Sequence, residues 1–270
     1  MSWSWTALMP HPPVLVPEVG HGRERKAAVT LEGVGKTAKE LTGLRPDCLL
    51  LLSPHQPYAQ GALFVNAAPR LKGSFASYGA PLVGFAPKTA TERMRSMTDH
   101  LTQNGISVRA GDFPDLSRDQ GTLVPLYFLG LAWSGDKTDG ETPPLVLASP
   151  IGLDLAAALN LGEVLASFDD GVRWALLASG DLSHRLTPDA PSGYSPAGEK
   201  FDVAVVEALS LGSPDPLLGL APKEVEAAGE CGLRSIMAML GLCRALGKQI
   251  DVISYEGPFG VGYCNAVSIF

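Results

Sequence analysis

The chain has few cysteines, no long apolar run and no strongly basic stretch, and each shortage excludes a class of protein. No apolar run reaches the roughly 20 residues that cross a bilayer, and no basic segment followed by a long apolar one marks a signal peptide. The low cysteine count favours reduced thiols and a cytoplasmic location. The absence of CxxC pairs leaves a zinc finger or a thioredoxin-like motif unsupported. The four cysteines of the 270-residue chain are Cys48, Cys231, Cys243 and Cys264.

The charge balance gives no indication of a nucleic-acid or membrane partner. Acidic residues outnumber basic ones by 28 to 21, and they are spread along the chain without a basic stripe. A hydrophobic content of 46% with 18% charged residues is typical of a globular protein with a substantial core. We therefore expect a soluble protein of one large domain or two small ones.

Strand-like and helix-like segments alternate along the chain. No internal repeat or long linker divides it, so the pattern predicts a single α/β domain over residues 1–270. Two of the expected strands, 61–66 and 71–75, are short enough to pair with one another as an antiparallel unit. The expected strands are 3–8, 48–52, 61–66, 71–75, 107–110, 145–149, 173–179, 250–255 and 262–270. The expected helices are 24–41, 89–104 (capped by Thr89 or Thr91), 121–133, 154–159, 162–169, 199–209 and 228–246.

Three of the five histidines follow an apolar, strand-like run that stops at proline or glycine. They are His11 in MPHPP, His55 in LLLLSPHQP and His184 in ASGDLSH. In an open α/β sheet, ligands bind beyond the carboxyl ends of the strands, and imidazole is both the commonest metal ligand and an acid or base near neutral pH. The pattern predicts an enzyme with a metal site at that edge. His21, in a glycine-flanked loop, and His100, in a polar helix, are expected to be solvated.

The two histidines beside prolines are the expected metal ligands, His11 and His55, because the stiff turns reduce the entropy cost of holding them still. Two histidines and one carboxylate form the facial arrangement of non-haem Fe(II) oxygenases, which can also host zinc. Glu230 is the first-ranked third ligand, since the dipole of a helix starting there would keep it ionised. Glu256, in a turn after a strand, ranks second, and the thiolate of Cys231 ranks third.

The third strand-end histidine, His184, is expected to act as an acid or base, with Ser179 and Asp181 orienting its ring. Structural roles are the alternatives: a capping or surface histidine for His184, and proline-rich surface turns for His11 and His55. Two glycine-containing segments give weak signals only. The GVGK segment at 33–36 lacks the spacing of a phosphate loop, and GPFGVG at 257–262 links two expected strands instead of opening a helix.

Several motifs together resemble those of class III extradiol ring-cleavage dioxygenases of the catalytic-subunit (LigB-like) type and their Memo-like relatives. The resemblance rests on PHPP, LLLLSPHQPY, RDQGTLVPLYFL, LASGDLSHRL, GEC and FGVGY, and it covers nearly the whole chain. It implies one α/β domain around a central mixed sheet flanked by helices, with Fe(II) in a cleft at the strand-end edge. It also implies that His11, His55 and Glu230 are the metal ligands and that His184 is the acid–base residue.

One position departs from the pattern that this resemblance implies. Many family members have Asp-His-Gly where this chain has Asp119, Gln120 and Gly121. Gln120 can form a hydrogen bond to a substrate or to bound oxygen, but it cannot transfer a proton at neutral pH. Memo-like relatives have cysteine where the dioxygenases have glutamate. Because Glu230 and Cys231 are neighbours here, the chain lies between the two patterns.

Three functions follow as hypotheses. The first is an Fe(II)-dependent extradiol dioxygenase that opens a catechol- or aminophenol-like ring with O2, using His184 and Gln120 beside the metal. The second, motivated by Gln120 and Cys231, is a Memo-like metal-binding accessory or redox protein without ring-opening activity, for which zinc or copper are alternative metals. The third, a zinc hydrolase, lacks an obvious second carboxylate as base. The expected partners are a small aromatic substrate and O2, with a homo-oligomer or a small second subunit left open.

Overall fold

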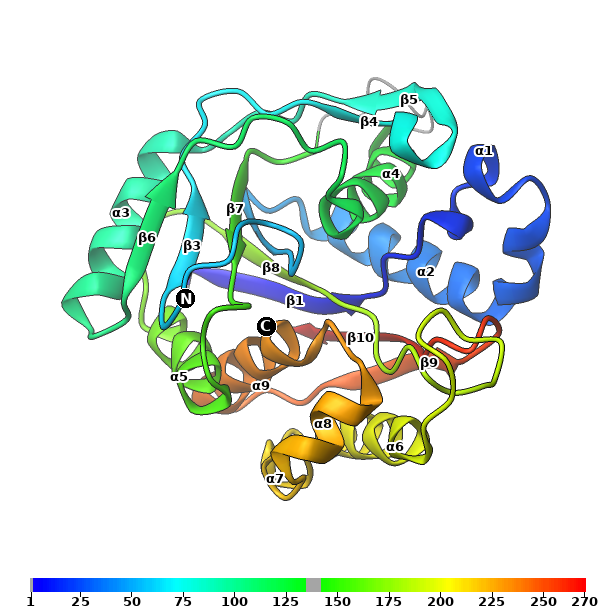
Figure 1. The fold of residues 1–270 in the computed structure, drawn as a ribbon. Helices are drawn as coiled ribbons and strands as arrows, with labels where there is room; N and C mark the ends of the chain where they lie inside the picture. The colour runs from blue at the N-terminus through cyan, green and yellow to red at the C-terminus, as the bar shows by residue number, and fades with distance from the viewer. Residues whose placement is uncertain (1, 135–141) are drawn as a thin grey trace.

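A mixed β-sheet forms the centre of the molecule (Figure 1). The computed structural model describes residues 2–134 and 142–270, and within them the main sheet has eight strands in the order β6-β3-β7-β2-β8-β1-β10-β9. Strands β1, β2, β7 and β8 are parallel neighbours, whereas β10 and β9 add antiparallel strands at one edge. The strands are β1 (Trp3–Met9), β2 (Cys48–Leu52), β3 (Leu63–Asn66), β6 (Val108–Gly111), β7 (Leu145–Ser149), β8 (Trp174–Ser179), β9 (Asp251–Glu256) and β10 (Tyr263–Ile269).

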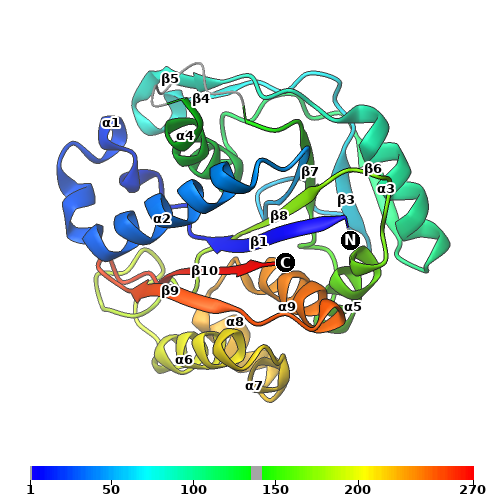
Figure 2. The same cartoon turned by 180° about the vertical axis from the view of Figure 1, so that it is seen from behind.

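Helices cover both faces of this sheet (Figures 1 and 2). Buried residues of α2 and α4 form one hydrophobic cluster with one face, and those of α3, α5, α6 and α9 form a second cluster with the other. Short helices α1, α7 and α8 lie in the connections. The helices are α1 (Pro17–Gly20), α2 (Ala28–Leu44), α3 (Thr91–Gln103), α4 (Gln120–Ser134), α5 (Leu155–Ala166), α6 (Pro196–Leu211), α7 (Asp215–Leu218), α8 (Pro222–Ala228) and α9 (Leu233–Leu246).

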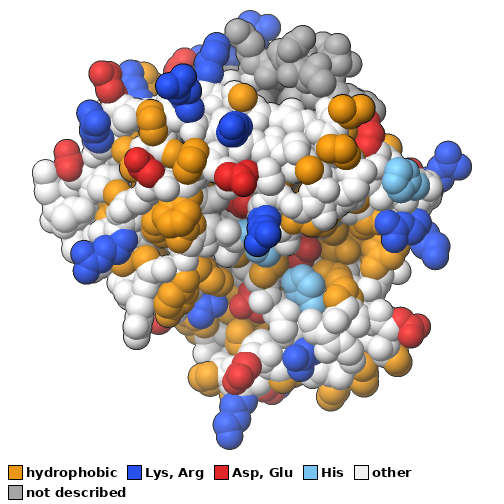
Figure 3. All heavy atoms as spheres, turned by 45° about the horizontal axis from the view of Figure 1, so that its top comes forward, with side chains coloured by type: hydrophobic (Ala, Val, Ile, Leu, Met, Phe, Trp, Pro, Cys, Tyr) orange, Lys and Arg blue, Asp and Glu red, His pale blue; other side chains and the backbone are white. Residues whose placement is uncertain are grey.

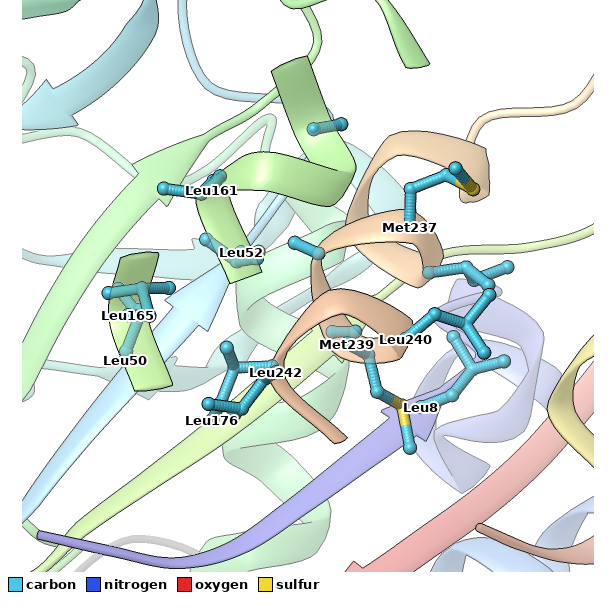
Figure 4. Packing of buried hydrophobic residues seen from close by; sticks show 14 of the residues in the cluster. Leu8, Leu50, Leu52, Leu161, Leu165, Leu176, Met237, Met239, Leu240 and Leu242 are labelled. Atoms are coloured by element: carbon cyan, nitrogen blue, oxygen red, sulfur yellow. The ribbon is translucent and has the colours of Figure 1, made fainter. Parts of the chain in front are cut away.

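The leucine run of β2 explains why this strand lies in the middle of the sheet. Successive side chains of a strand point to opposite faces, so Leu49 and Leu51 pack with the α2 and α4 cluster, and Leu50 and Leu52 pack with the other. Figure 4 shows Leu50 and Leu52 with leucine and methionine side chains of α5 and α9. Each fully buried leucine contributes roughly 1.5–3 kcal/mol relative to an exposed one, which stabilises a strand covered on both faces.

The expectation of a single α/β domain with a central mixed sheet flanked by helices is confirmed. The expected pairing of 61–66 with 71–75 is wrong. Strand β3 is buried throughout and joins the main sheet between β6 and β7, while β4 (Gly73–Phe75) pairs with β5 (Ala80–Phe85) in a small separate sheet. Strand β5 was not predicted, because Pro81 and Gly84 interrupt its alternation of apolar and polar residues.

Two helix predictions need correction. The expected helices 154–159 and 162–169 form one helix, α5. Gly162 lies inside it, where a Cβ would overlap the carbonyl of Ala238 in α9, so this glycine permits close helix packing and does not break the helix. The expected helix 228–246 begins only at Leu233. Helix α8 ends at Ala228, and Gly229 follows in the left-handed conformation (φ 64°) that commonly ends a helix. Residues 229–232 therefore form a short loop between α8 and α9.

The expected cap of α3 is also absent. Ala90 occupies the N-cap position without a side-chain hydrogen bond, and Thr91 is the first residue of the helix. The hydroxyl of Thr89 donates instead to the carbonyl of Pro69 at 2.7 Å. The threonine therefore ties two loops together and does not cap the helix.

Candidate metal site

The three strand-end histidines lie at one edge of the sheet. Strands β1, β2 and β8 run parallel and side by side, so their carboxyl ends meet at the same edge. His11 follows the end of β1, His55 the end of β2, and His184 the end of β8. Figure 3 shows histidine side chains around a hollow in the middle of one face, bordered by hydrophobic and charged side chains. The strand-end pattern thus brings these histidines into one region.

Two imidazoles and one thiol converge at this edge. The Nε2 atoms of His11 and His55 are 3.0 Å apart, and the two rings meet at an interplanar angle of 74°. The Sγ atom of Cys231 lies 3.5 Å from Nε2 of His11. The three donor atoms all lie within 4.8 Å of one another, so this group could hold a metal ion.

The spacing between His11 and Cys231 fits a shared cation. A tetrahedral ion with metal–nitrogen distances of about 2.0 Å and a metal–sulfur distance of about 2.3 Å separates nitrogen from sulfur by about 3.5 Å. This value matches the 3.5 Å between His11 and Cys231. Nδ1 of His11 is hydrogen-bonded to the hydroxyl of Ser179 at 2.9 Å. Such a partner on the second ring nitrogen fixes the orientation of a metal-binding histidine.

Burial keeps both imidazoles in the form that binds metals. His11 is buried, and this burial, together with the nearby His55, lowers its pKa well below the usual value, while Asp119 opposes the shift. Burial also lowers the pKa of His55, against the effects of Asp119 and Asp181. Both rings are therefore neutral at neutral pH, with a lone pair available for a cation.

The thiol of Cys231 is protonated in the absence of a cation. Burial raises the pKa of Cys231 well above the usual value, and the nearby Asp181 carboxylate raises it further. The backbone N–H of Asp181 donates to Sγ at 3.4 Å and opposes this shift. A coordinated metal ion deprotonates such a thiol, so binding a cation here would release a proton.

A backbone contact between two glycines brings Cys231 to the histidines. A Cβ on Gly180 would overlap the Cα of Gly232, and the N–H of Gly232 donates to the carbonyl of Asp181 at 3.0 Å. The loop formed by residues 229–232 therefore lies directly on the end of β8. Any side chain at Gly180 would push this loop, and Cys231 with it, away from His11.

Asp181 lies between His11 and His184 and contacts both. Its Oδ1 accepts the backbone N–H of His11 at 2.8 Å, and its Oδ2 lies 3.9 Å from Nε2 of His184. Burial raises the pKa of Asp181 to about 6, although His184 and the N–H of His11 oppose the shift. Ser179 and Asp181 were both expected to orient His184. Ser179 instead binds the ring of His11, so only Asp181 lies near His184.

His184 lies beside the group and is not one of its three donors. Its Nδ1–H donates to the carbonyl of Gly229 at 2.7 Å, which leaves Nε2 as the acceptor nitrogen. The side chain is partly exposed. A ring fixed through one nitrogen, with the other open, has the arrangement that an acid–base residue requires.

Glu230 and Glu256, the two carboxylates expected as third ligands, are engaged elsewhere. Oε2 of Glu230 accepts the N–H of Leu233 at 2.7 Å, at the start of α9, and Oε1 lies 3.6 Å from Arg234. Burial raises the pKa of Glu230, against the effects of these two partners. Glu256 accepts the N–H and the hydroxyl of Thr30 at 2.6 and 2.7 Å. Of the three expected third ligands, only Cys231 lies with the histidines in the part of the chain that the structure describes.

Gln120 lies at the start of α4 and is held by a tyrosine. The hydroxyl of Tyr78 donates to Oε1 of Gln120 at 2.6 Å. Burial raises the pKa of Tyr78, and the nearby Asp119 carboxylate adds to the shift. The amide of Gln120 therefore has a fixed orientation next to Asp119.

Asp119, to which the sequence analysis assigned no role, is a buried residue beside the candidate site. Its buried carboxylate accepts hydrogen bonds from Ser53 at 2.6 Å, from Gln56 at 2.5 Å and from the N–H of Thr122 at 2.9 Å. It thereby ties the loop that carries His55 to the start of α4, and its charge opposes the lowering of the pKa values of His11 and His55 by burial. Its position before an apolar helix, where aspartate is a common cap, was an available signal.

The two remaining histidines lie outside this group. His21 is exposed at the end of α1, in agreement with its expected solvation. His100 was also expected to be solvated, but its Nε2 contacts the hydroxyl of Ser167 at 3.1 Å and its ring packs on Phe168. It therefore links α3 to the end of α5.

The chain can be compared with a family model, a curated protein and a solved structure. The model of the catalytic LigB subunit of aromatic ring-opening dioxygenase matches residues 5–265. Protein CA_C1420 of Clostridium acetobutylicum is 32% identical over 273 residues, which cover 97% of this chain and 57% of that relative. The chain thus spans little more than half the length of this curated relative.

The structural comparison concerns the fold alone. The crystal structure of uncharacterized protein JW3007 from Escherichia coli K12 superimposes with a TM-score of 0.63 at 14% sequence identity, covering 98% of this chain and 99% of that one. Within residues 2–134 and 142–270, no helix has both the length and the apolar character needed to cross a membrane.

Proposed function

The chain belongs to the LigB family, the catalytic subunits of aromatic ring-opening dioxygenases, and we propose that it acts through a metal ion held by His11, His55 and Cys231. The observation that carries this proposal is the convergence of two Nε2 atoms and one Sγ atom within 4.8 Å. Two neutral imidazoles and a thiol that loses its proton to a cation supply three ligands for one ion and leave a further position open.

The donor set favours a Memo-like metal-binding or redox function over ring opening. Thiolate and imidazole ligands suit copper and zinc, whereas Fe(II) oxygenases use two histidines and a carboxylate. Glu230, the carboxylate nearest in sequence, forms hydrogen bonds at the start of α9 instead. A copper or iron ion in this site would supply one-electron chemistry, which zinc cannot. The free state of all four cysteines supports a reducing, cytoplasmic location as part of the proposal.

The second candidate function is extradiol opening of a catechol- or aminophenol-like ring with O2. Family membership favours it, and so does the position of His184, whose Nε2 is available to take a proton from a substrate hydroxyl. Gln120 would orient the substrate through hydrogen bonds without moving a proton. For this function the metal would be Fe(II), and the partners would be a small aromatic molecule and O2.

Metal reconstitution separates the two candidates. Metal-free protein is titrated anaerobically with Cu(I), Zn(II) and Fe(II), and the stoichiometry is compared among wild type, Cys231→Ser and Glu230→Gln. We expect Cys231→Ser to lose tight binding and Glu230→Gln to retain it. Loss of binding in Glu230→Gln alone would overturn the proposed ligand set. Each metal-loaded form is then exposed to O2 and a panel of catechols and aminophenols, where coloured ring-opened products would support the second candidate.

A further inference from the structure

A second cavity lies on the other side of the loop that carries Cys231. Its volume is about 500 Å³, within the roughly 300–1,000 Å³ range of small-molecule sites. It is a partly open pocket bordered by the start of α5, by α8 and the segment before it, and by the start of α9. Its lining includes Asp154, Leu155, Val225, Glu226, Gly229 and Glu230.

The cavity is separate from the candidate metal site, although both use the same loop. His11, His55 and Cys231 do not line it. Gly229 does line it, and its carbonyl accepts the Nδ1–H of His184 on the other side. An occupant of the cavity would therefore contact the metal-site loop without contacting the metal.

The cavity is lined by apolar side chains and by one ion pair whose charges compensate each other. Leu155, Leu220 and Val225 supply aliphatic surface. Oε1 of Glu230 lies 3.6 Å from Nη1 of Arg234. The Nε–H of Arg234 also donates to the carbonyl of Leu153 at 2.8 Å. The arginine therefore has two protein partners and is poorly placed to recognise an anionic ligand.

The charge that remains at the cavity is negative. Asp154 caps α5 through Oδ1, which accepts the N–H of Ala157 at 2.7 Å, and Glu226 of α8 also lines the cavity, both side chains being exposed. Carboxylates beside low-dielectric walls attract cations more strongly than they do in open solvent. From this combination we propose that the cavity binds a small apolar molecule with one positive charge, such as an arylalkyl ammonium. The ammonium group lies near Asp154 and Glu226, and the apolar part lies against the leucine and valine side chains.

Calorimetric titration with a matched set of probes tests this proposal. The probes are 2-phenylethylamine, 2-phenylethanol and phenylacetate, which share a ring and differ in charge. We expect saturable one-to-one binding of the amine, about tenfold weaker binding of the alcohol, and still weaker binding of the anion. If the amine binds no more tightly than the alcohol, the proposal is wrong.

Two sets of variants locate the binding. Asp154→Asn with Glu226→Gln removes both charges, and asparagine is as good a helix cap as aspartate, so the amine should lose its advantage over the alcohol while the protein stays folded. Glu207→Gln removes an exposed charge on α6, outside the cavity, and should change nothing. Val225→Trp fills the cavity and should abolish binding of every probe.

The same titration distinguishes this cavity from the metal site. Cys231→Ser should bind the amine as wild type does, in the presence and in the absence of added metal. Loss of amine binding in Cys231→Ser, or its persistence in Val225→Trp, would place the probe elsewhere and would contradict the proposal. Because one arm of the amine titration uses metal-free protein, failure of the proposed metal function would leave that arm unaffected.

Discussion

Gly180 and Gly232 pack backbone against backbone at the end of β8. A Cβ on Gly180 would overlap the Cα of Gly232. This close approach keeps the loop between α8 and α9 on the sheet edge, where Sγ of Cys231 is 3.5 Å from Nε2 of His11. The position of the thiol therefore depends on two residues that have no side chain of their own.

Gly180→Ala should weaken metal binding without unfolding the protein. The added methyl group forces the loop outward, so Cys231 no longer reaches the histidines, and we expect metal affinity to fall by about 10–100-fold, as for other changes that disturb ligand orientation. The measurement is a competition titration with a metal chelator. Gly35→Ala is the matched control, because a Cβ at this position in α2 meets nothing within 4 Å. Equal metal affinity in Gly180→Ala and Gly35→Ala would contradict the assigned role of this contact.

His11→Ala and His55→Ala should each abolish stoichiometric metal binding. Either change leaves one imidazole and one thiol, which are too few protein ligands for a stable site. Elemental analysis of freshly purified protein measures the bound metal. His21→Ala is the control, since His21 is exposed at the end of α1. A variant that lost either ligand histidine and still bound one equivalent tightly would show that the site lies elsewhere.

His184→Ala should retain the metal and lose most of any turnover. The ring lies beside the donor group and is fixed through Nδ1, so its removal deletes a proton carrier and no ligand. Loss of a general acid or base typically lowers the rate by about 10²–10⁴-fold. Rate constants and metal content are measured on the same sample. Metal loss in this variant would make His184 a ligand instead.

Gln120→His should raise any rate of catechol cleavage or extend the range of rings that are opened. The substitution restores a group that can transfer a proton at the start of α4, where the Tyr78 hydroxyl holds Gln120 at 2.6 Å. The assay follows coloured product with the Fe(II)-loaded protein. If the substitution has no effect and wild type is inactive across a broad panel, the metal-binding or redox function is favoured over ring opening.

The buried carboxyl of Asp202 should make the protein less stable as the pH rises. Burial raises the pKa of Asp202 to about 7, although hydrogen bonds from Ser183 and Tyr255 oppose the shift. Aspartate in an unfolded chain has a pKa of about 3.9. The folded state therefore prefers the protonated carboxyl, and its stabilising contribution is complete below about pH 4 and is lost as the pH rises to about 7.

Urea unfolding of Asp202→Asn and wild type between pH 4.5 and 8 tests this prediction. Asparagine has the same size and cannot ionise, so the free energy of unfolding of the variant should fall less steeply with pH. The loss of stability with rising pH that wild type shows and the variant lacks should amount to about 1.4 kcal/mol for each unit by which folding raises the pKa of Asp202. A constant difference between the two proteins across this range would mean that Asp202 does not titrate as described.

The strand-end histidines were predictable because parallel strands deliver their carboxyl ends to one edge, whatever the details of the loops. The third donor was not. The sequence pattern placed Glu230 in the first turn of an expected helix, 228–246. In the structure Gly229 adopts φ 64°, and the helix begins only at Leu233. The resulting loop turns Glu230 towards Arg234 and Cys231 towards His11. Which of these two neighbouring side chains faces the histidines depends on this backbone conformation, and neither periodicity nor charge reveals it.

The position of β1 has a consequence for the order in which the molecule folds. Trp3 pairs with Trp174 of β8, and Trp5 pairs with Ile269 of β10. Pairings between residues so far apart in sequence slow folding, because a long loop must close before any contact compensates its entropy. His11 directly follows this strand, so the metal-binding group can assemble only after β1 has inserted between β8 and β10. Metal ions would then bind a chain that is already nearly native, and they would slow its unfolding more than they speed its folding.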